Sequence, residues 1–391
     1  MIIAPRIRSN VCVNAHPFGC AAQVETQINY VKARETVESP RRALVIGASN
    51  GFGLAARIVS AFGSGADSIG VGFERQAMRD RTATAGWYNI EAFKQAAQKA
   101  GLGAWNVNGD AFSDEIKTKV AELIREHLGQ IDFLVYSIAA PRRIDPETGE
   151  IYTSVIKPIG RPFTALSADF LSGKINEVTA QPATPDEIVQ TVKVMGGEDW
   201  SRWIEWLQAE NLLADEFLTL AFSYIGSEFT RPLYRDGTIG AAKKDLEQRA
   251  AEINRKLQPL NGRAIISVNK ALVTRASAVI PAVPLYIALL YRVMKQKQLH
   301  EGCIQQMYRL YHDYLFTADG PIVDDAGRIR LDDWEMRDDV QKEVTNLLKR
   351  VNTGNISELT DIKGLREEFL RHHGFGMPGV NYQADVPPEA L

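Results

Sequence analysis

Short apolar runs alternate with longer amphipathic stretches from residue 42 onward. The apolar runs are rich in Val, Ile and Leu, and each pair leaves room for a helix between them. Strands that alternate with helices in this way indicate βαβ crossovers and a parallel sheet. The pattern therefore predicts an α/β fold built on a doubly wound parallel sheet. Strands are expected over residues 43–46, 68–73, 104–108, 131–137, 219–225 and 263–268, with helices after residue 51, near 88–99 and over 114–127.

Two regions depart from this alternation. Residues 141–199, between the fourth and fifth strands, are rich in Pro, Gly and Thr, and we interpret them as a β-containing flap beside the site. Residues 284–391 show helical periodicity and predict a helical C-terminal elaboration. Since no linker or repeat divides the chain, we expect a single domain over residues 1–391. C-terminal helices are expected over residues 286–298, 302–315, 332–351 and 359–372.

The longest uncharged stretch covers residues 276–291 and contains Pro281 and Pro284. A membrane-spanning helix needs about 20 apolar residues, so no membrane insertion is expected. A buried helix that lines a pocket and a helix that only fills the core both fit this stretch. Near the start of the chain, Arg6 and Arg8 interrupt the apolar residues, so no signal peptide is expected.

Composition narrows the class of protein. The chain has 391 residues and a formal net charge of −3, with acids and bases interspersed. Such a balance is typical of a globular protein, and the sequence has no run of basic residues of the kind that binds nucleic acid. Cys12, Cys20 and Cys303 form no C-x-x-C pair and no even set, which favours a reduced, cytoplasmic compartment. Trp200, Trp203 and Trp206, at helical spacing, are expected in the core.

A G-x-x-x-G-x-G turn follows the first strand and opens a helix. Glycines suit this turn because a Cβ would keep the backbone amides and the helix N-terminus away from a pyrophosphate. Glu74 comes about 20 residues later, at the end of the second strand, where an acid holds the ribose of a dinucleotide. The sequence thus predicts a Rossmann-type cofactor site. The turn consists of Gly47, Ala48, Ser49, Asn50, Gly51, Phe52 and Gly53.

Glu74 also bears on the choice of cofactor. Its carboxylate would repel a 2′-phosphate, which favours NADH over NADPH. Arg75, Arg79 and Arg81 could accommodate that phosphate, so the strictness of the preference stays open. Two alternatives to dinucleotide binding are a plain βα turn and a site for the adenosyl group of a methyl donor.

Residues 110–111 and 138–139 follow the third and fourth strands. Ligands of doubly wound sheets bind at these carboxyl ends, so Asp110 with Ala111 and Ile138 with Ala139 are candidates for adenine and nicotinamide-ribose contacts. Asp110 could instead cap the helix that follows.

A reduction that begins with hydride transfer also needs a proton donor. A tyrosine can be that donor if a nearby ammonium lowers its pKa. Tyr234 and Lys243 form a Y-x8-K pair between the fifth and sixth strands, the position expected for a catalytic segment; Lys244 would point elsewhere. Tyr291 and Lys295 form a Y-x-x-x-K pair, as in short-chain dehydrogenases. That second pair follows the last predicted main strand, which is the wrong order for the superfamily.

With these motifs the chain resembles the trans-2-enoyl-CoA reductases and the related V-type enoyl-acyl-carrier-protein reductases, which are large relatives of the short-chain dehydrogenases. The similarity covers nearly the whole chain, and the Y-x8-K pair is the distinguishing mark of that family. The other matching motifs are Asn10-Val-Cys-Val-Asn-Ala-His-Pro, Gly47-Ala-Ser-Asn-Gly-Phe-Gly, Ala85-Gly-Trp-Tyr-Asn, Val268-Asn-Lys-Ala-Leu-Val-Thr and Gly374-Phe-Gly.

The resemblance implies NADH-dependent reduction of the C2=C3 double bond of a trans-2-enoyl thioester, carried on acyl carrier protein or CoA, in fatty-acid synthesis. It implies that Tyr234 donates the proton, that Lys243 binds the NADH ribose and tunes the tyrosine, and that Tyr224 contacts the thioester carbonyl. It further implies cofactor contacts from Gly47, Ala48, Ser49, Asn50, Gly51, Phe52, Phe73, Glu74, Asp110, Ala111, Ile138, Ala139, Leu272, Val273 and Thr274.

Other functions stay as alternatives. The same fold supports carbonyl reduction of the short-chain dehydrogenase type, and it could serve as a non-catalytic NAD-binding module. A metal site is not expected, because His372 and His373 lack any H-E-x-x-H or Cys/His spacing, and His16 is expected to be structural. No G-x-S-x-G elbow supports hydrolysis. A monomer is expected, and oligomers stay open.

Overall fold

A parallel sheet forms the centre of the computed structural model, which describes residues 1–8, 11–169, 172–274 and 282–391. Within these residues the sheet has seven strands in the order β13-β12-β11-β6-β3-β4-β5, and every neighbouring pair is parallel. The strands expected from the apolar runs are confirmed. β13 has three residues, too few to give a sequence signal. The strands are β3 (Arg42–Ile46), β4 (Asp67–Gly72), β5 (Ala104–Asn108), β6 (Ile131–Tyr136), β11 (Leu213–Ser223), β12 (Arg263–Val268) and β13 (Arg328–Arg330).

The order of the strands creates a switch point beside β3. From β3 the chain proceeds outward through β4 and β5, and it then returns to add β6 on the other side of β3. In doubly wound sheets, ligands bind outside the carboxyl ends of the strands at this point. The turns that follow β3 and β6 therefore face the expected cofactor position.

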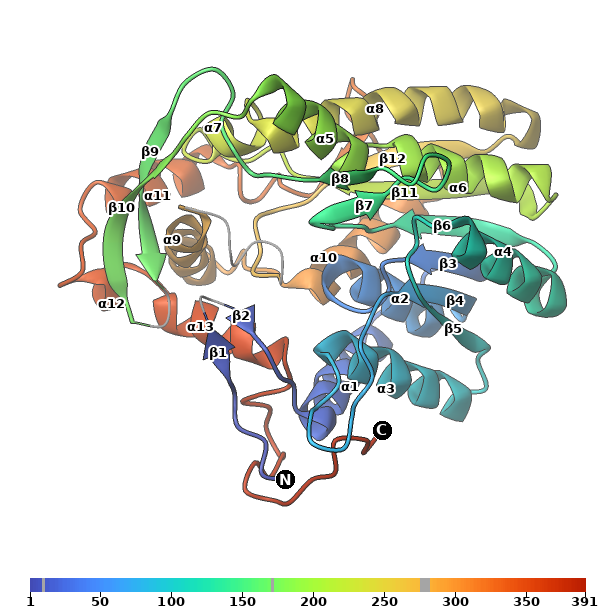
Figure 1. Cartoon of the computed structure of the whole chain (residues 1–391), viewed down its shortest axis with the longest axis horizontal. Coiled ribbons are helices and arrows are strands. Elements are labelled where there is room, and N and C mark those ends of the chain that lie inside the picture. Colours follow the sequence, from blue (N-terminus) through green and yellow to red (C-terminus); the bar gives the residue numbers. More distant parts are fainter. Residues whose placement is uncertain (9–10, 170–171, 275–281) are drawn as a thin grey trace.

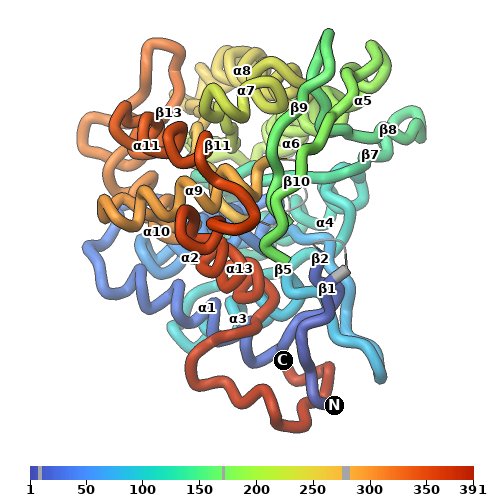
Figure 2. The backbone as a smooth tube through the Cα atoms, turned by 90° about the vertical axis from the view of Figure 1, so that its left-hand side faces the viewer, coloured from blue at the N-terminus to red at the C-terminus, as the bar shows by residue number. Residues whose placement is uncertain are grey.

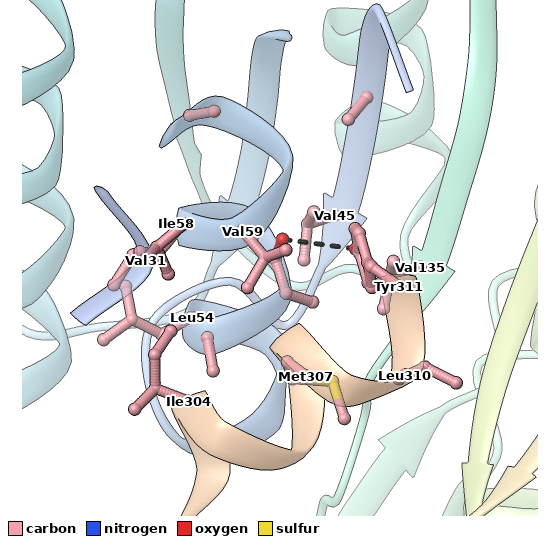
Figure 3. Packing of buried hydrophobic residues seen from close by; sticks show 14 of the residues in the cluster. Val31, Val45, Leu54, Ile58, Val59, Val135, Ile304, Met307, Leu310 and Tyr311 are labelled. Carbon is pink, nitrogen blue, oxygen red and sulfur yellow. Dashed lines mark hydrogen bonds between the residues drawn. The ribbon is translucent and has the colours of Figure 1, made fainter. Parts of the chain in front are cut away.

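Helices cover both faces of the sheet (Figure 1). Side chains of β3 alternate between the two cores: Val45 belongs to one, and Leu44 and Ile46 belong to the other. Figure 3 shows the first core, where Val59 of α2 packs near Tyr311 and Val45. On this side lie α1 (Pro17–Lys32), α2 (Gly51–Ser64), α3 (Ala85–Lys99), α10 (Cys303–Arg309) and the π-helical turn Leu310–Leu315. On the other side lie α4 (Asp114–Leu123), the π-helical turn Ile124–Leu128, α6 (Glu198–Ala209) and α8 (Thr238–Leu257), which ends in the 3-10 turn Gln258–Leu260. Trp200 and Trp203 are 0% exposed in this second core, as expected, whereas Trp206 is only partly buried and packs against that core.

The predicted flap does contain strands. β7 (Arg142–Ile144) pairs with β8 (Ile151–Thr153), and β9 (Phe163–Asp169) pairs with β10 (Lys174–Ala180), both antiparallel. α5 (Pro185–Met195) follows and begins at a capping box. Figures 1 and 2 show the β9–β10 hairpin beyond the sheet, where β9 packs beside α9 (Val283–Gln296).

The C-terminal region adds a third apolar core beside the sheet, with α9 at its centre (Figure 2). From Leu285 to Tyr291 every residue of α9 is 0–1% exposed, so this part of the helix is buried on all sides. Residues 276–281 of the uncharged stretch lie outside the described residues. Around α9 stand α11 (Asp338–Leu348), α12 (Ile356–Leu359) and α13 (Ile362–Arg371).

The helix predicted over 332–351 is shorter than expected. α11 begins only at Asp338, and residues 332–336 form turns. The carboxylate of Asp332 forms an ion pair with Arg330, and that of Glu335 faces inward and accepts from the amide of Ala271. Both side chains therefore bind partners within the fold and do not lie on the surface of a helix. At the other end of the chain, β1 (Ile7–Arg8) pairs with β2 (Val11–Cys12).

The two termini meet (Figure 1): the Met1 amino group donates to the carbonyl oxygen of Val386 at 2.9 Å. None of the helices in the described part of the chain is both long and apolar enough to span a membrane.

Candidate functional site

The turn between β3 and α2 has the backbone that its glycines predict. Gly47 has a φ of +85°, and a Cβ on it would lie 2.0 Å from the carbonyl oxygen of Ser137. A Cβ on Gly53 would lie 2.1 Å from the carbonyl oxygen of Gly47. Among the described residues, the N-cap Asn50 makes no side-chain hydrogen bond to the first turn of α2. The amides of that turn are therefore left for an anion, which fits the pyrophosphate of a dinucleotide.

Glu74 follows β4 and lies against this turn. Its Oε1 accepts hydrogen bonds from Ser49 Oγ at 2.7 Å and from Asn50 Nδ2 at 3.2 Å. The side chain of Asn108 binds both the amide and the carbonyl of Glu74, at 2.7 and 2.9 Å. A Cβ on Gly86 of α3 would lie 2.2 Å from Oε1, so this glycine makes room for the carboxylate. The acid is thus held beside the glycine turn, and its contact with a ribose stays a prediction.

The strand ends at 110–111 and 138–139 lie at the same edge of the sheet, after β5 and β6. Asp110 Oδ1 accepts from the amide of Phe112 at 3.0 Å, and Ser113 is the N-cap of α4. The alternative that Asp110 caps this helix is therefore wrong. Ser113 is the N-cap because its Oγ accepts a hydrogen bond from the amide of Ile116, three residues later.

The segment after β12 reaches back to the glycine turn. A Cβ on Gly51 would lie 3.9 Å from Cγ2 of Thr274. Val273 is buried, and its amide donates to the hydroxyl of Tyr291 at 3.1 Å. Tyr291 is 0% exposed, while Lys295 forms an ion pair with Asp361, just before α13. The Y-x-x-x-K pair is thus part of the packing around α9.

Tyr234 lies at the end of the short helix α7 (Arg231–Tyr234) and is 8% exposed. Its ring meets that of Tyr224 edge to face, with the centroids 4.6 Å apart. Tyr224 directly follows β11. The next helix, α8, begins at Thr238 and carries Lys243.

Lys243 of α8 connects this region to the cofactor turn. Its Nζ donates to the carbonyl oxygen of Phe222 at 2.8 Å. The ring of Phe222 lies 5.5 Å from that of Phe52, which belongs to the glycine turn. The neighbouring Lys244 is exposed, in agreement with its predicted direction. The predicted catalytic pair and the predicted cofactor turn therefore come together at the carboxyl end of β11.

The electrostatics of the pair differ from expectation. Burial raises the pKa of Tyr234 above its usual value, and the carboxylate of Glu335 raises it further. That an ammonium lowers this pKa stays a prediction, because in the structure burial dominates and Lys243 donates to a carbonyl oxygen instead. Burial lowers the pKa of Lys243 to about 8.

A buried carboxylate beside these tyrosines was not predicted. Glu335 is 0% exposed. Its Oε1 accepts from the hydroxyl of Tyr224 at 3.1 Å and from that of Tyr286 at 2.7 Å, and its Oε2 accepts from the amide of Ala271 at 2.6 Å. The only signal in the sequence is an acid between two apolar residues, Trp334 and Met336.

His16 caps α1, and its Nδ1 accepts from the amide of Gly19 at 3.1 Å, so it has a structural role as expected. Within the described ranges, no group of three or more His, Cys, Asp or Glu residues could hold a metal ion.

Family models match three consecutive parts of the chain. Residues 2–79 match the NAD(P)H binding domain of trans-2-enoyl-CoA reductase, and residues 81–316 match the trans-2-enoyl-CoA reductase catalytic region. Residues 323–386 match the enoyl reductase FAD binding domain.

Individual relatives match over nearly their whole length. The enoyl-[acyl-carrier-protein] reductase [NADH] of Opitutus terrae is 52% identical, covering 99% of both chains. The trans-2-enoyl-CoA reductase [NADH] of Ruminiclostridium cellulolyticum is 49% identical, covering 100% of this chain and 98% of the relative. The crystal structure of Treponema denticola trans-2-enoyl-CoA reductase in complex with NAD has a TM-score of 0.96 at 50% identity, covering 99% and 98%. That of Clostridium acetobutulicum trans-2-enoyl-CoA reductase in complex with NADH has a TM-score of 0.97 at 46% identity, covering 100% and 99%.

The name of the C-terminal family model raises the question of a flavin. Residues 323–386, all of them described, contain no buried side-chain polar atom without a hydrogen-bond partner. Apolar residues of α11 and α13, such as Val340, Val344, Leu365 and Phe369, are instead buried in the core around α9. The carboxylate of Glu335 already has donors on both oxygens. These residues therefore do not fit FAD.

Proposed function

The chain belongs to the trans-2-enoyl-CoA reductase family, and from this premise we propose that it uses NADH to reduce trans-2-enoyl thioesters at C2=C3, giving saturated acyl thioesters. One observation carries the proposal. A buried phenol, Tyr234, stands against Tyr224 at the carboxyl edge of the sheet, next to a strand end that contacts the glycine turn through Phe222 and Phe52. That arrangement brings an acid and a hydride donor to the same substrate.

Tyr224 and Tyr234 have separate roles in the proposed reaction. When bound, NADH supplies the hydride that adds to C3, which moves negative charge onto the thioester oxygen. Tyr224 donates a hydrogen bond to that oxygen, since a donor aimed at developing charge stabilises the enolate. Tyr234 gives its proton, so that C2 gains a hydrogen and the double bond becomes single; solvent then returns a proton to the phenol.

Lys243 has two tasks in this proposal. Its ammonium, held by the Phe222 carbonyl in the structure, would turn to the nicotinamide ribose, and its positive charge would favour the phenolate that Tyr234 leaves behind. Burial already lowers the pKa of Lys243 to about 8, so its charge depends on pH near neutrality.

The remaining cofactor contacts are proposed at the glycine turn, at Glu74, and at the ends of β5, β6 and β12. Because Glu74 is held beside the turn by Ser49 and Asn50, we expect NADH to be preferred over NADPH. The free thiols of Cys12, Cys20 and Cys303 agree with a reduced compartment, so we place the reaction in the cytoplasm, in fatty-acid synthesis, with the protein as a monomer.

The test is an assay of NADH absorbance with trans-2-enoyl-CoA substrates of short and long chain, and with the same acyl groups on acyl carrier protein. We expect oxidation of NADH and a saturated acyl thioester as product, and slower turnover with NADPH. A hydroxyacyl product from a ketoacyl thioester, with no reduction of enoyl substrates, would replace the proposal with carbonyl reduction. Tight NADH binding without turnover of either substrate would indicate a non-catalytic module.

A further inference from the structure

Glu335 joins three separated parts of the chain at the proposed site. Its carboxyl group is bound by Tyr224 after β11, by Tyr286 on α9 and by the amide of Ala271 after β12. The Ala271 amide directly precedes the segment proposed to contact the cofactor. A single carboxyl group therefore sets the positions of a proposed substrate tyrosine and a proposed cofactor loop.

Counting hydrogens at this carboxyl group shows a conflict. A tyrosine hydroxyl has one hydrogen to donate. If Glu335 is ionised, both of its oxygens only accept, so Tyr224 must give its single hydrogen to Oε1. Tyr224 then has none left for the thioester oxygen.

Tyr286 cannot resolve the conflict, because its own hydroxyl is occupied on both sides. Gln341 Nε2 lies 3.1 Å from the Tyr286 hydroxyl and 2.7 Å from the backbone carbonyl oxygen of Glu335. Since that carbonyl only accepts, the atom facing both groups is a donor nitrogen. The Tyr286 oxygen therefore accepts from Gln341, and its hydrogen points to Oε1 of Glu335.

We infer that Glu335 is a positioning residue that carries a proton on Oε1 in the reacting complex and donates it to the Tyr224 oxygen, which frees the Tyr224 hydrogen for the thioester carbonyl. The inference rests on the proposed function. In this arrangement Oε1 still accepts from Tyr286 with its other lone pair, and Oε2 still accepts from Ala271. Both oxygens of Glu335 and the hydroxyl hydrogens of Tyr224 and Tyr286 then each have a partner, and Tyr224 has the donor that the enolate requires.

The charges around the cluster agree with a neutral Glu335. Burial is the main cause that raises its pKa, and Asp332 adds to the rise, whereas Lys270 and the hydrogen bonds from Tyr286 and Ala271 oppose it. Lys270 donates to the carbonyl oxygens of Ala271 and Glu301. A neutral Glu335 also removes the negative charge that raises the pKa values of Tyr224 and Tyr234, and so makes Tyr234 a better acid.

The test uses the full chain with Glu335→Gln, Glu335→Ala, Tyr224→Phe and the double variant Tyr224→Phe/Glu335→Gln. The amide nitrogen of Gln can donate to Tyr224 as a protonated acid does, although it cannot accept from Tyr286, so we expect Glu335→Gln to keep kcat within about 10-fold of the parent. We expect Glu335→Ala to lose roughly 100-fold, because Tyr224 keeps its hydrogen but is no longer positioned to donate it to the developing oxyanion. If Glu335 acts through Tyr224, the double variant is no slower than Tyr224→Phe. The affinity for NADH is expected to change little in each of these variants.

Two readouts keep the inference open to refutation if Glu335→Ala does not fold. First, infrared difference spectra of the parent against Glu335→Gln should contain the carbonyl stretch of a protonated acid; its absence in the complex with a saturated acyl thioester overturns the inference. Second, if Glu335→Gln alone shows a loss and that loss adds in full to the loss of Tyr224→Phe in the double variant, the inference is overturned as well. The control is Glu301→Gln, a buried acid that binds Arg309 and no tyrosine, for which no change in kcat is expected.

Adding Tyr234→Phe to these variants separates this inference from the proposed function. If the parent protein does not reduce enoyl thioesters, the proposed function fails. If the parent does so and Tyr234→Phe is inactive, while all Glu335 variants act like the parent, only the role of Glu335 fails.

Discussion

The cofactor side and the catalytic side of the proposed site are built in different ways. On the cofactor side, the glycine turn, Glu74 and the strand ends each follow a strand of the sheet; most of them lie between residues 47 and 139, and the segment after β12 adds residues 272–274. On the catalytic side, Tyr224, Tyr234, Tyr286 and Glu335 come from a strand end, a one-turn helix, a buried helix and a turn.

This difference shows what holds each side in place. The cofactor turn is fixed by close backbone contacts, since Gly47 and Gly53 leave no room for a Cβ. The catalytic side is fixed by hydrogen bonds between distant side chains, with Glu335 in the middle. We therefore expect substitutions on the cofactor side to change binding, and substitutions on the catalytic side to change kcat.

The largest effect is expected for Tyr234→Phe. Removing the proton donor should lower kcat by about 10² to 10⁴ while NADH affinity stays near that of the parent. Steady-state kinetics with a trans-2-enoyl-CoA and NADH titration by fluorescence measure the two quantities. The matched control is Tyr311→Phe, another buried tyrosine, which binds Ser60 and Ala56 in the core of Figure 3. It should lower the melting temperature without lowering kcat. A parent-like rate for Tyr234→Phe would refute the assigned role.

A smaller effect is expected on the cofactor side, for Gly47→Ala. The new Cβ would lie 2.0 Å from the Ser137 carbonyl oxygen at a φ of +85°, so the turn must move. We expect NADH to bind about 10-fold more weakly, as a loss of about 1.4 kcal/mol gives, with kcat at saturating NADH less affected. Gly65→Ala is the control: its φ is +73°, but no heavy atom of the described residues lies within 4 Å of a Cβ there. Equal NADH affinities in the two variants would mean that the close contact at Gly47 does not affect NADH binding.

The same contrast explains what the sequence could predict. The strands of the sheet were predictable because both of their faces are buried, which leaves continuous apolar runs. The glycine turn and Glu74 were predictable because they follow those strands at fixed spacings. β13 was not, since three residues with one apolar side chain give no pattern.

The catalytic side was predictable only where a motif marks it. Tyr234 and Lys243 were found from their place between two strands. Glu335 was missed because residues 332–351 show helical periodicity, while its contacts to Tyr224 and Tyr286 exist only in the folded chain. The rise in the pKa of Tyr234 could not be predicted for a similar reason, because burial and the charge of Glu335 depend on packing that spacing does not reveal.

The smallest effect, a change with pH, connects the two sides through Lys243. Burial lowers its pKa to about 8, so the side chain is charged below that pH and neutral above it. Because kcat/KM for NADH reports groups of the free enzyme, it should be highest below pH 8, fall to about half at pH 8 and decline further above it. In Lys243→Arg the guanidinium stays charged, so the alkaline decline should disappear, although the different shape of the group lowers the rate. The exposed neighbour provides the control, since Lys244→Arg should leave the profile unchanged. If the decline near pH 8 persists in Lys243→Arg, it belongs to another group, and Lys270, whose pKa burial also lowers to about 8, would be the next to substitute.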